Sequence, residues 1–186
     1  HEGASRAARR TTGRGTSRHR RHPVLTPDAA WRALEGVPDP EVPVISVVEL
    51  GIIREVAVDA AGGVAVTITP TYSGCPAMFE IEKDVRSALL AAGAAAVTVT
   101  TVLSPAWTTD WIPESAREKL RRYGIAPPGK ADGGALVTLT RARPPVPCPW
   151  CGSTLTELRS EFGSTACKAI HVCTSCRQPF DEFKAI

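Results

Sequence analysis

Long apolar runs are missing from this chain of 186 residues. None reaches the roughly 18 residues that a membrane-spanning helix needs, and the first residues lack the apolar stretch of a secretory signal. Histidine is also scarce: the chain has four, of which three lie within residues 1–22 and the fourth is His171. We therefore expect a soluble, cytoplasmic protein without a membrane partner. A di-iron site built from carboxylate-plus-histidine helices is excluded as well.

Acidic residues are nearly absent from the first 22 positions, which contain seven Arg and one acid, Glu2. The remaining chain holds 15 basic and 18 acidic side chains, so it is mildly acidic. The N-terminal segment has no apolar periodicity and much Gly, Ser and Thr, which predicts a disordered tail over residues 1–24. Such a tail could attract nucleic acid or serve in targeting, or it could be an extension without a role of its own.

Four of the six cysteines form two Cys-x-x-Cys pairs near the C-terminus. Cys148 and Cys151 make the first pair, and Cys173 and Cys176 make the second, with 21 residues between the pairs. Two such turns aim four sulfurs at one point, which predicts a tetrahedral, structural Zn²⁺ site in a β-ribbon. A rubredoxin-like iron site and a thiol relay are the alternatives. This spacing suits a reducing cytoplasm better than a disulfide framework.

Three residues around these pairs have open roles. Cys167 lies between the pairs and could be a spare ligand, a reactive thiol or a buried apolar residue. We expect His171 to pack rather than to bind metal, because four cysteines already complete a site. Trp150, inside the first pair, could cover the metal or contact a partner.

The chain before the ribbon predicts an α+β domain with a small mixed sheet. Thr26, Pro27 and Asp28 favour a helix start that runs to Gly36, and Pro113 starts another helix that ends at Gly124. Apolar residues at three- and four-residue steps predict a helix over residues 76–92. Strands are predicted over residues 52–59, 64–69, 96–103 and 135–140. We expect this domain to span residues 25–141 and the zinc ribbon, with strands near 154–160 and 169–172, to span residues 142–186.

A lone thiol, Cys75, lies in the first domain, directly after a predicted strand and before the helix predicted over residues 76–92. In the first turn of a helix, unpaired backbone N–H groups and the helix dipole favour a thiolate. Such a sulfur can hold iron transiently or attack an electrophile, or it can be a small apolar cap. Asp39 and Glu41 flank Pro40 in a proline-rich loop, and on their own they indicate a turn or a cap. Trp107 and Trp111 could belong to the core or to an exposed patch.

Several stretches together resemble a known family. The first part of the chain resembles the iron–sulfur assembly domain of SufT and of the eukaryotic cytosolic iron–sulfur targeting factors. The matching segments run from Asp39 to Ser46, from Glu49 to Ile52 and from Thr71 to Pro76. Further segments resemble a narrower family, the D component of bacterial phenylacetyl-CoA epoxidase systems. These are residues 104–111, 116–128, 148–153, 162–165 and 179–184. The resemblance covers about residues 26–186.

The resemblance implies an accessory or maturation role in aerobic phenylacetate breakdown, without catalysis by this chain alone. It implies that Cys75 handles an iron–sulfur cluster or iron transiently, with Asp39, Glu41 and Thr71 as its motif partners. The oxygenase or reductase subunits of the epoxidase would be the partners. The alternatives are a thiol-dependent enzyme that uses Cys75 and a nucleic-acid-binding zinc ribbon. The acidic balance of the folded part makes us expect no nucleic-acid partner.

Overall fold

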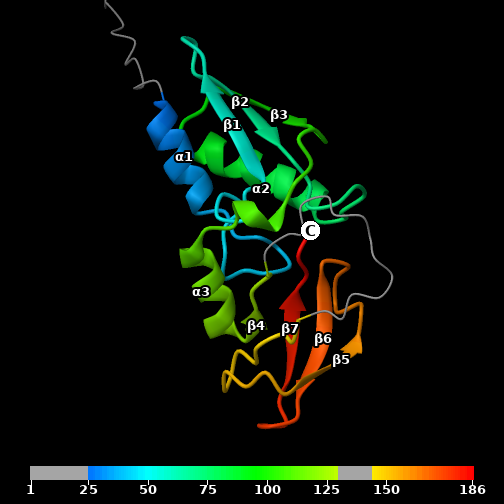
Figure 1. Ribbon diagram of the computed structural model, residues 1–186. Coiled ribbons are helices and arrows are strands. Elements are labelled where there is room, and N and C mark those ends of the chain that lie inside the picture. Colours follow the sequence, from blue (N-terminus) through cyan, green and yellow to red (C-terminus); the bar gives the residue numbers. More distant parts are fainter. Residues whose placement is uncertain (1–24, 130–143) are drawn as a thin grey trace, which may run out of the picture.

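The computed structural model describes residues 25–129 and 144–186, which form two small sheets lying one beyond the other (Figure 1). Helices α1 and α2 lie along the first sheet, and α3 lies beside β4 of the second. The first sheet has the order β1-β2-β3, and the second has the order β4-β7-β6-β5. The fold is α+β, with a mixed sheet followed by a ribbon, as the sequence predicts. No helix within the described residues is long and apolar enough to cross a lipid bilayer.

The first sheet is a hairpin with a third strand added in parallel. Strand β1 (Ile53–Val58) pairs antiparallel with β2 (Gly63–Ile68), and β2 pairs parallel with β3 (Ala96–Thr101). Helix α2 (Met78–Ala91) makes the crossover between β2 and β3 and packs on β3, while α1 (Pro27–Glu35) packs on α2 and β1. Because the chain turns from β2 into α2 at the end of the sheet, the loop with Cys75 lies at that end.

The core of this first part follows the predicted periodicities. Alternate residues of β2 and every third or fourth residue of α2 are buried, and these are Val64, Val66, Ile68, Ile81, Val85 and Leu89. The predicted cap of α1 is also present, because the Thr26 hydroxyl accepts a hydrogen bond from the Ala29 backbone N–H at 3.2 Å. Gly36 ends this helix as expected.

The second sheet joins the ribbon to the first part of the chain. Strands β5 (Thr156–Ser160), β6 (Lys168–Cys173) and β7 (Pro179–Phe183) are antiparallel neighbours, and β4 (Ile125–Ala126) adds to β7 in parallel. The sequence predicts β5 and β6 but neither β4 nor β7. Since β4 follows α3 (Glu114–Tyr123) directly, the ribbon sheet includes a strand from outside the ribbon.

Two tryptophans with open roles have defined places. Trp107 is buried, and its indole N–H donates to the Leu50 carbonyl at 2.9 Å while its ring lies 6.2 Å from the ring of Phe183. Trp111 ends the short 3₁₀ turn η1 (Thr109–Trp111) and is half-buried beneath the Arg54 guanidinium, 3.6 Å from its ring centre. Trp107 therefore belongs to the core, where it connects the first part of the chain to β7.

The predicted start of α2 is wrong by two residues. The helix begins at Met78 with Ala77 as its N-cap, because two tight turns come first: Cys75 N–H donates to the Tyr72 carbonyl and Met78 N–H donates to the Cys75 carbonyl. Cys75 therefore lies before the helix rather than in its first turn. The tail 1–24, the strand predicted over 135–140 and the boundary at 141/142 lie outside the described residues.

Candidate metal sites in the ribbon and at the domain junction

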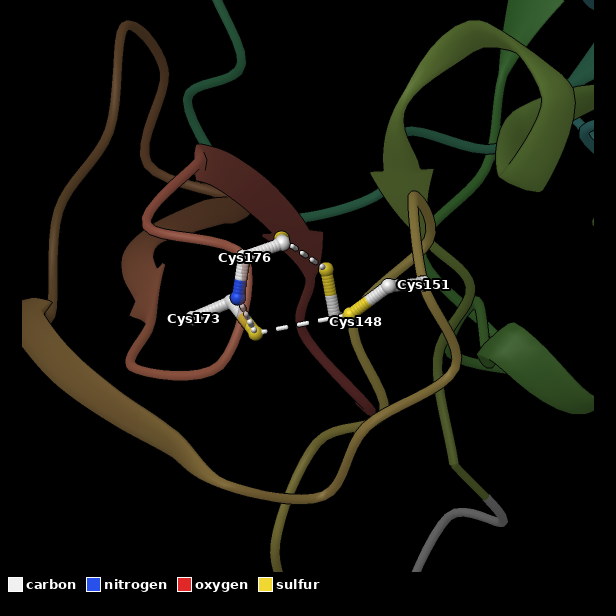
Figure 2. A group of neighbouring side chains, drawn as sticks. All are labelled: Cys148, Cys151, Cys173 and Cys176. Atoms are coloured by element: carbon white, nitrogen blue, oxygen red, sulfur yellow. Dashed lines mark hydrogen bonds between the residues drawn. The ribbon is translucent and has the colours of Figure 1, made fainter.

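The four predicted zinc ligands converge on one point, with all four sulfurs within 4.8 Å of one another (Figure 2). Cys148 Sγ lies 3.7 Å from Cys176 Sγ, and Cys151 Sγ lies 3.6 Å from Cys173 Sγ. With Zn–S bonds of about 2.3 Å, a regular tetrahedron has edges of about 3.8 Å. The donor set and its spacing therefore fit a four-coordinate zinc ion with no position left open, which is the form of a structural site.

Both knuckles use the same backbone turn. Gly152 N–H donates to the Cys148 carbonyl at 2.9 Å, and Arg177 N–H donates to the Cys173 carbonyl at 2.8 Å. Each of these donors follows the second cysteine of its pair and has a positive φ, 74° for Gly152 and 62° for Arg177. Glycine takes this conformation without strain, whereas arginine does so at a cost that the metal site must offset.

The thiols of the cluster differ in their acidity. The Cys176 backbone N–H lies 3.5 Å from Cys173 Sγ and, with the neighbouring thiols, lowers the pKa of Cys173 to about 7. The pKa of Cys176 is raised to about 12: the backbone N–H of Gln178 lowers it, but burial and the adjacent thiols outweigh that effect. Four sulfurs packed this closely ionise together only when a cation balances them, as Zn²⁺ would.

The other two ribbon residues with open roles lie outside this cluster. His171 is buried, stacks on Phe180 with ring centres 5.4 Å apart, and shares a 2.8 Å hydrogen bond between its Nε2 and Glu182 Oε2. His171 therefore packs on the aromatic ring and lies outside the four-cysteine group. Trp150 lies against Gly124 at the end of α3, and its indole N–H points to the Pro179 carbonyl at 3.4 Å.

A second group of predicted site residues lines one small cavity between the two parts of the chain. Apolar side chains that include Leu50, Ile52 and Phe183 complete its wall, and its volume is about 10 Å³, roughly the space of one water molecule. The structure thus brings together residues from the proline-rich loop, the single-cysteine loop and the ribbon: Asp39, Glu41, Thr71, Cys75 and Cys167.

Asp39 shapes the proline-rich loop from inside. Its carboxylate Oδ1 accepts hydrogen bonds from the backbone N–H groups of Glu41, at 2.9 Å, and Val42, at 2.8 Å. The side chain is only 5% exposed, and this burial raises the pKa of Asp39 above its usual value. Asp39 therefore holds Glu41 in place while it adds a buried acidic group to the cavity.

Cys167 has polar neighbours although it is buried. Its Sγ lies 3.1 Å from the Thr165 hydroxyl and donates to Glu41 Oε2 at 3.8 Å. Burial raises the pKa of this thiol, and it raises the pKa of Glu41 as well. The ammonium group of buried Lys168 reaches the Glu41 carbonyl at 3.5 Å and supplies the nearby positive charge.

Cys75 stands at the more exposed side of the cavity. It is half-buried, while its neighbours Ser73, Gly74 and Pro76 are exposed. Three residues before it in sequence, Tyr72 has a raised pKa, first because of burial and then because of the Cys75 and Glu41 charges.

Sequence reasoning missed two residues whose charge or dipole acts on the cavity residues, Tyr72 and Lys168. Tyr72 could have been found as the aromatic residue within the Thr71–Pro76 motif, whereas nothing in the sequence marks Lys168. Among the described residues, only the ribbon cysteines bring three or more metal-binding atoms within 4.8 Å of one another. The cavity therefore gathers donor side chains in an open arrangement rather than a closed coordination shell.

Both parts of the chain match known protein families. Residues 27–102 match the family described as iron–sulfur cluster assembly protein, and residues 132–184 match the PaaD zinc beta ribbon domain. The class is thus an iron–sulfur assembly domain combined with a zinc ribbon. The chain is 48% identical over 156 residues, 84% of this chain and 91% of the relative, to the putative D component of the 1,2-phenylacetyl-CoA epoxidase of Escherichia coli strain K12. It belongs to the family of these epoxidase D components.

Two further relatives match the first domain's length rather than the whole chain. An Fe-S protein maturation auxiliary factor of Porphyromonas gingivalis is 40% identical over 98 residues, which are 52% of this chain and 92% of that protein. A solved domain of unknown function, DUF59, from Bacillus anthracis is 28% identical, with a TM-score of 0.47, and the match covers 50% of this chain and 89% of that one.

Proposed function

We propose that this chain is an accessory, maturation component of a 1,2-phenylacetyl-CoA epoxidase in aerobic phenylacetate catabolism, and that it assists the assembly of an iron–sulfur or di-iron centre in another subunit. One observation carries the proposal. Cys75, Asp39, Glu41 and Thr71, which come from two separate loops of an iron–sulfur assembly-type domain, line a single cavity. The similarity to the epoxidase D component and to a maturation factor supports an accessory role in maturation rather than in catalysis.

In this proposal the four ribbon cysteines and the cavity at Cys75 bind different metals for different purposes. The ribbon's zinc ion is structural, because all four tetrahedral positions are taken by cysteine. Iron, alone or in a cluster, is cargo at Cys75, which is partly exposed and so accessible to a donor and to a recipient. None of the six cysteines, all of which lie in the described residues, forms a disulfide, which fits a reducing cytoplasm. The recipient is the oxygenase or the reductase subunit.

The groups around Cys75 suit a temporary iron site. A thiolate is a strong ligand for iron, and a carboxylate is a weaker, harder ligand that exchanges more readily. Iron binding at the Cys75 sulfur displaces the thiol proton, so uptake is coupled to proton release. Glu41, which lines the same cavity, can accept that proton. No step in this scheme acts on the phenylacetyl-CoA substrate.

The test is co-expression of the epoxidase oxygenase and reductase subunits with wild type or with the Cys75→Ser variant. We expect the iron and sulfide content of the purified partners to fall, with Cys75→Ser, toward the level found when this chain is omitted. Ser73→Ala, an exposed neighbour of Cys75, is the matched control and should retain wild-type loading. Equal metal content of the partners with wild type and Cys75→Ser would refute the role of Cys75.

A further inference from the structure

We propose that Cys167 is the second thiol ligand of the Cys75 site, so that one ferrous iron ion is held between the two domains by Cys75 and Cys167 together with the Glu41 carboxylate. This inference rests on the proposed function, because it assumes that Cys75 receives iron. It adds a residue of the ribbon to a site that would otherwise contain one thiol. The zinc ribbon then has a part in iron handling as well as a structural zinc ion.

Three side chains from distant parts of the sequence meet at this site. Cys75 and Cys167 line the same cavity, and Cys167 Sγ is 3.8 Å from Glu41 Oε2. The Glu41 carboxylate lines this cavity as well, so the three side chains border one enclosed space. Their donor atoms are not all within 4.8 Å of one another, so the side chains must rearrange to bring two sulfurs and a carboxylate oxygen to one ion.

The simpler roles of Cys167 do not explain its surroundings. It is not a spare zinc ligand, because the four sulfurs of the zinc cluster are complete without it. Cys167 belongs to the main hydrophobic core, but its sulfur also contacts two polar groups, the Thr165 hydroxyl at 3.1 Å and the Glu41 carboxylate at 3.8 Å. Buried Lys168 next to it balances negative charge while the site is empty. These polar neighbours are more than a cysteine that only fills the core would need.

The size of the cavity favours a single ion. About 10 Å³ holds roughly one water molecule and hence one metal ion, whereas an iron–sulfur cluster would require the loop before α2 to move away. Exposure also falls from one thiol to the other, since Cys75 is half-buried and Cys167 is 4% exposed. Iron would enter past Cys75 and be retained by Cys167.

The second thiol also distinguishes this chain from a relative with one domain. The Porphyromonas gingivalis maturation factor is matched over 92% of its length by 98 residues, so it is too short to hold both domains. Cys167 belongs to the ribbon, and the ribbon therefore gives the chain a two-thiol site within a single copy. Two thiolates select thiophilic ions such as Fe²⁺ over Mg²⁺ or Ca²⁺.

The experiment uses the full chain with its ribbon loaded with zinc, kept anaerobic and reduced. Fe²⁺ binding is measured by equilibrium dialysis, and Co²⁺ serves as the spectroscopic probe, because sulfur-to-cobalt charge-transfer absorption grows with the number of thiolate ligands. We expect one added ion per wild-type chain, with the absorption of two thiolates. Cys75→Ser and Cys167→Ser should each weaken binding by at least about tenfold and reduce the absorption per ion to that of a single thiolate.

Two controls keep the result independent of folding. Ser164→Ala changes an exposed residue beside Cys167 and should match wild type in affinity and absorption. Zinc content is measured in every variant, because an intact ribbon retains one zinc per chain. Cys167→Ala is the second variant should Cys167→Ser lose zinc.

The outcomes separate this inference from the proposed function. If Cys75→Ser abolishes the added ion but Cys167→Ser binds it with wild-type affinity and absorption, Cys167 is not a ligand and only the inference fails. If wild type takes up no added ion, the inference fails, whereas cluster handling at Cys75 is decided by the metal content of the co-expressed partners. If Cys75→Ser takes up the ion as wild type does, Cys75 is not a ligand and the proposed function fails as well. Iron retained only together with acid-labile sulfide would overturn the assignment of a single ion.

Discussion

At the scale of single residues, the Asp39 carboxylate combines a structural and an electrostatic role. It accepts two backbone N–H groups and so fixes the loop that carries Glu41. It is also buried, which disfavours its charge and raises its pKa. Two substitutions separate these two roles of Asp39. Asn keeps an acceptor oxygen without the charge, whereas Ala removes both.

We expect Asp39→Ala to lower the free energy of unfolding by about 1–2 kcal/mol, as loss of a capping acceptor does, and Asp39→Asn to leave it equal or higher at pH 7. The sign follows from the raised pKa: the folded state binds this proton more tightly than the unfolded state, so ionised Asp39 opposes folding. Below the ordinary pKa of 3.8 this opposition is gone, and it develops as pH rises through the elevated folded pKa.

Urea unfolding of wild type and both variants between pH 3 and pH 7 measures this effect. The stability gap between Asp39→Asn and wild type should open as the pH rises, while the loss in Asp39→Ala should persist at low pH. If Asp39→Asn is destabilised as much as Asp39→Ala at neutral pH, the carboxylate charge is favourable here and the account of Asp39 is incorrect.

At the scale of elements, the end of α3 contacts the first zinc knuckle through Gly124 and Trp150. Gly124 has φ 90°, and a Cβ atom placed there would collide with the indole ring of Trp150. Gly93, which follows the end of α2, has φ 102° but nothing within 4 Å of such a Cβ. The two glycines thus separate the cost of a left-handed backbone from the cost of the contact with Trp150.

We expect Gly93→Ala to cost about 1 kcal/mol, the penalty of a left-handed alanine, and Gly124→Ala to cost more, on the order of 2–4 kcal/mol. Thermal unfolding monitored by circular dichroism ranks the variants. In a double-mutant cycle with Trp150→Ala, the Gly124→Ala cost should fall to nearly that of Gly93→Ala. Purely additive effects of Gly124→Ala and Trp150→Ala would show that the indole ring does not limit this position.

Elements with strong local signals were predictable, and those that depend on docking were not. Helix α1 has its cap, its proline and its terminal glycine in the sequence, so local chemistry alone places it. Strand β4 has two residues and forms because β7 lies beside it, so no periodicity can reveal it. One capping motif that the sequence shows was not predicted: Ser46 and Glu49 form a reciprocal capping box, with both hydrogen bonds at 3.1 Å.

The same division holds for the candidate sites. The zinc cluster was predictable because its ligands are paired in sequence, and each pair lies on one turn. The cavity residues Cys75, Asp39 and Glu41 come from motifs that the family resemblance indicates. That Cys167 joins them was not predictable, because it follows from how the ribbon docks on the first domain. Long-range contacts of that kind leave no local signal in a single sequence.

At the scale of the whole molecule, the ribbon is not simply attached to the first domain. Phe183 and Cys167 are buried in the main hydrophobic core, together with Trp107. Ile186 is also tied to the first part of the chain, since its carbonyl accepts from the Thr109 N–H at 3.1 Å and from the Thr108 hydroxyl at 2.8 Å. Zinc binding in the ribbon therefore stabilises parts of the core that lie beyond the metal site.

This coupling predicts that zinc removal weakens both parts of the chain. With the metal gone, the ribbon loses the binding free energy that folds it, on the order of 10 kcal/mol for structural zinc. When Phe183 leaves the core, the first domain loses about 2 kcal/mol of apolar burial, which corresponds to a melting point roughly 10 °C lower. Hydrogen exchange after chelation should show lost protection in β5, β6 and β7 and also at residues 107–109.

The control is the Cys148→Ser/Cys176→Ser variant, which lacks half of the zinc ligands and should respond little to a chelator. Its melting point should already equal that of the chelated wild type, because both have lost the same closed site. If the α1, α2 and β1–β3 region of chelated wild type melts at its zinc-loaded temperature, the ribbon is an independent module. In that case zinc removal would separate the ribbon, and Cys167 with it, from the first domain without unfolding that domain. Zinc removal should then lower iron uptake at Cys75 and Cys167 far more than it lowers the melting temperature of the first domain.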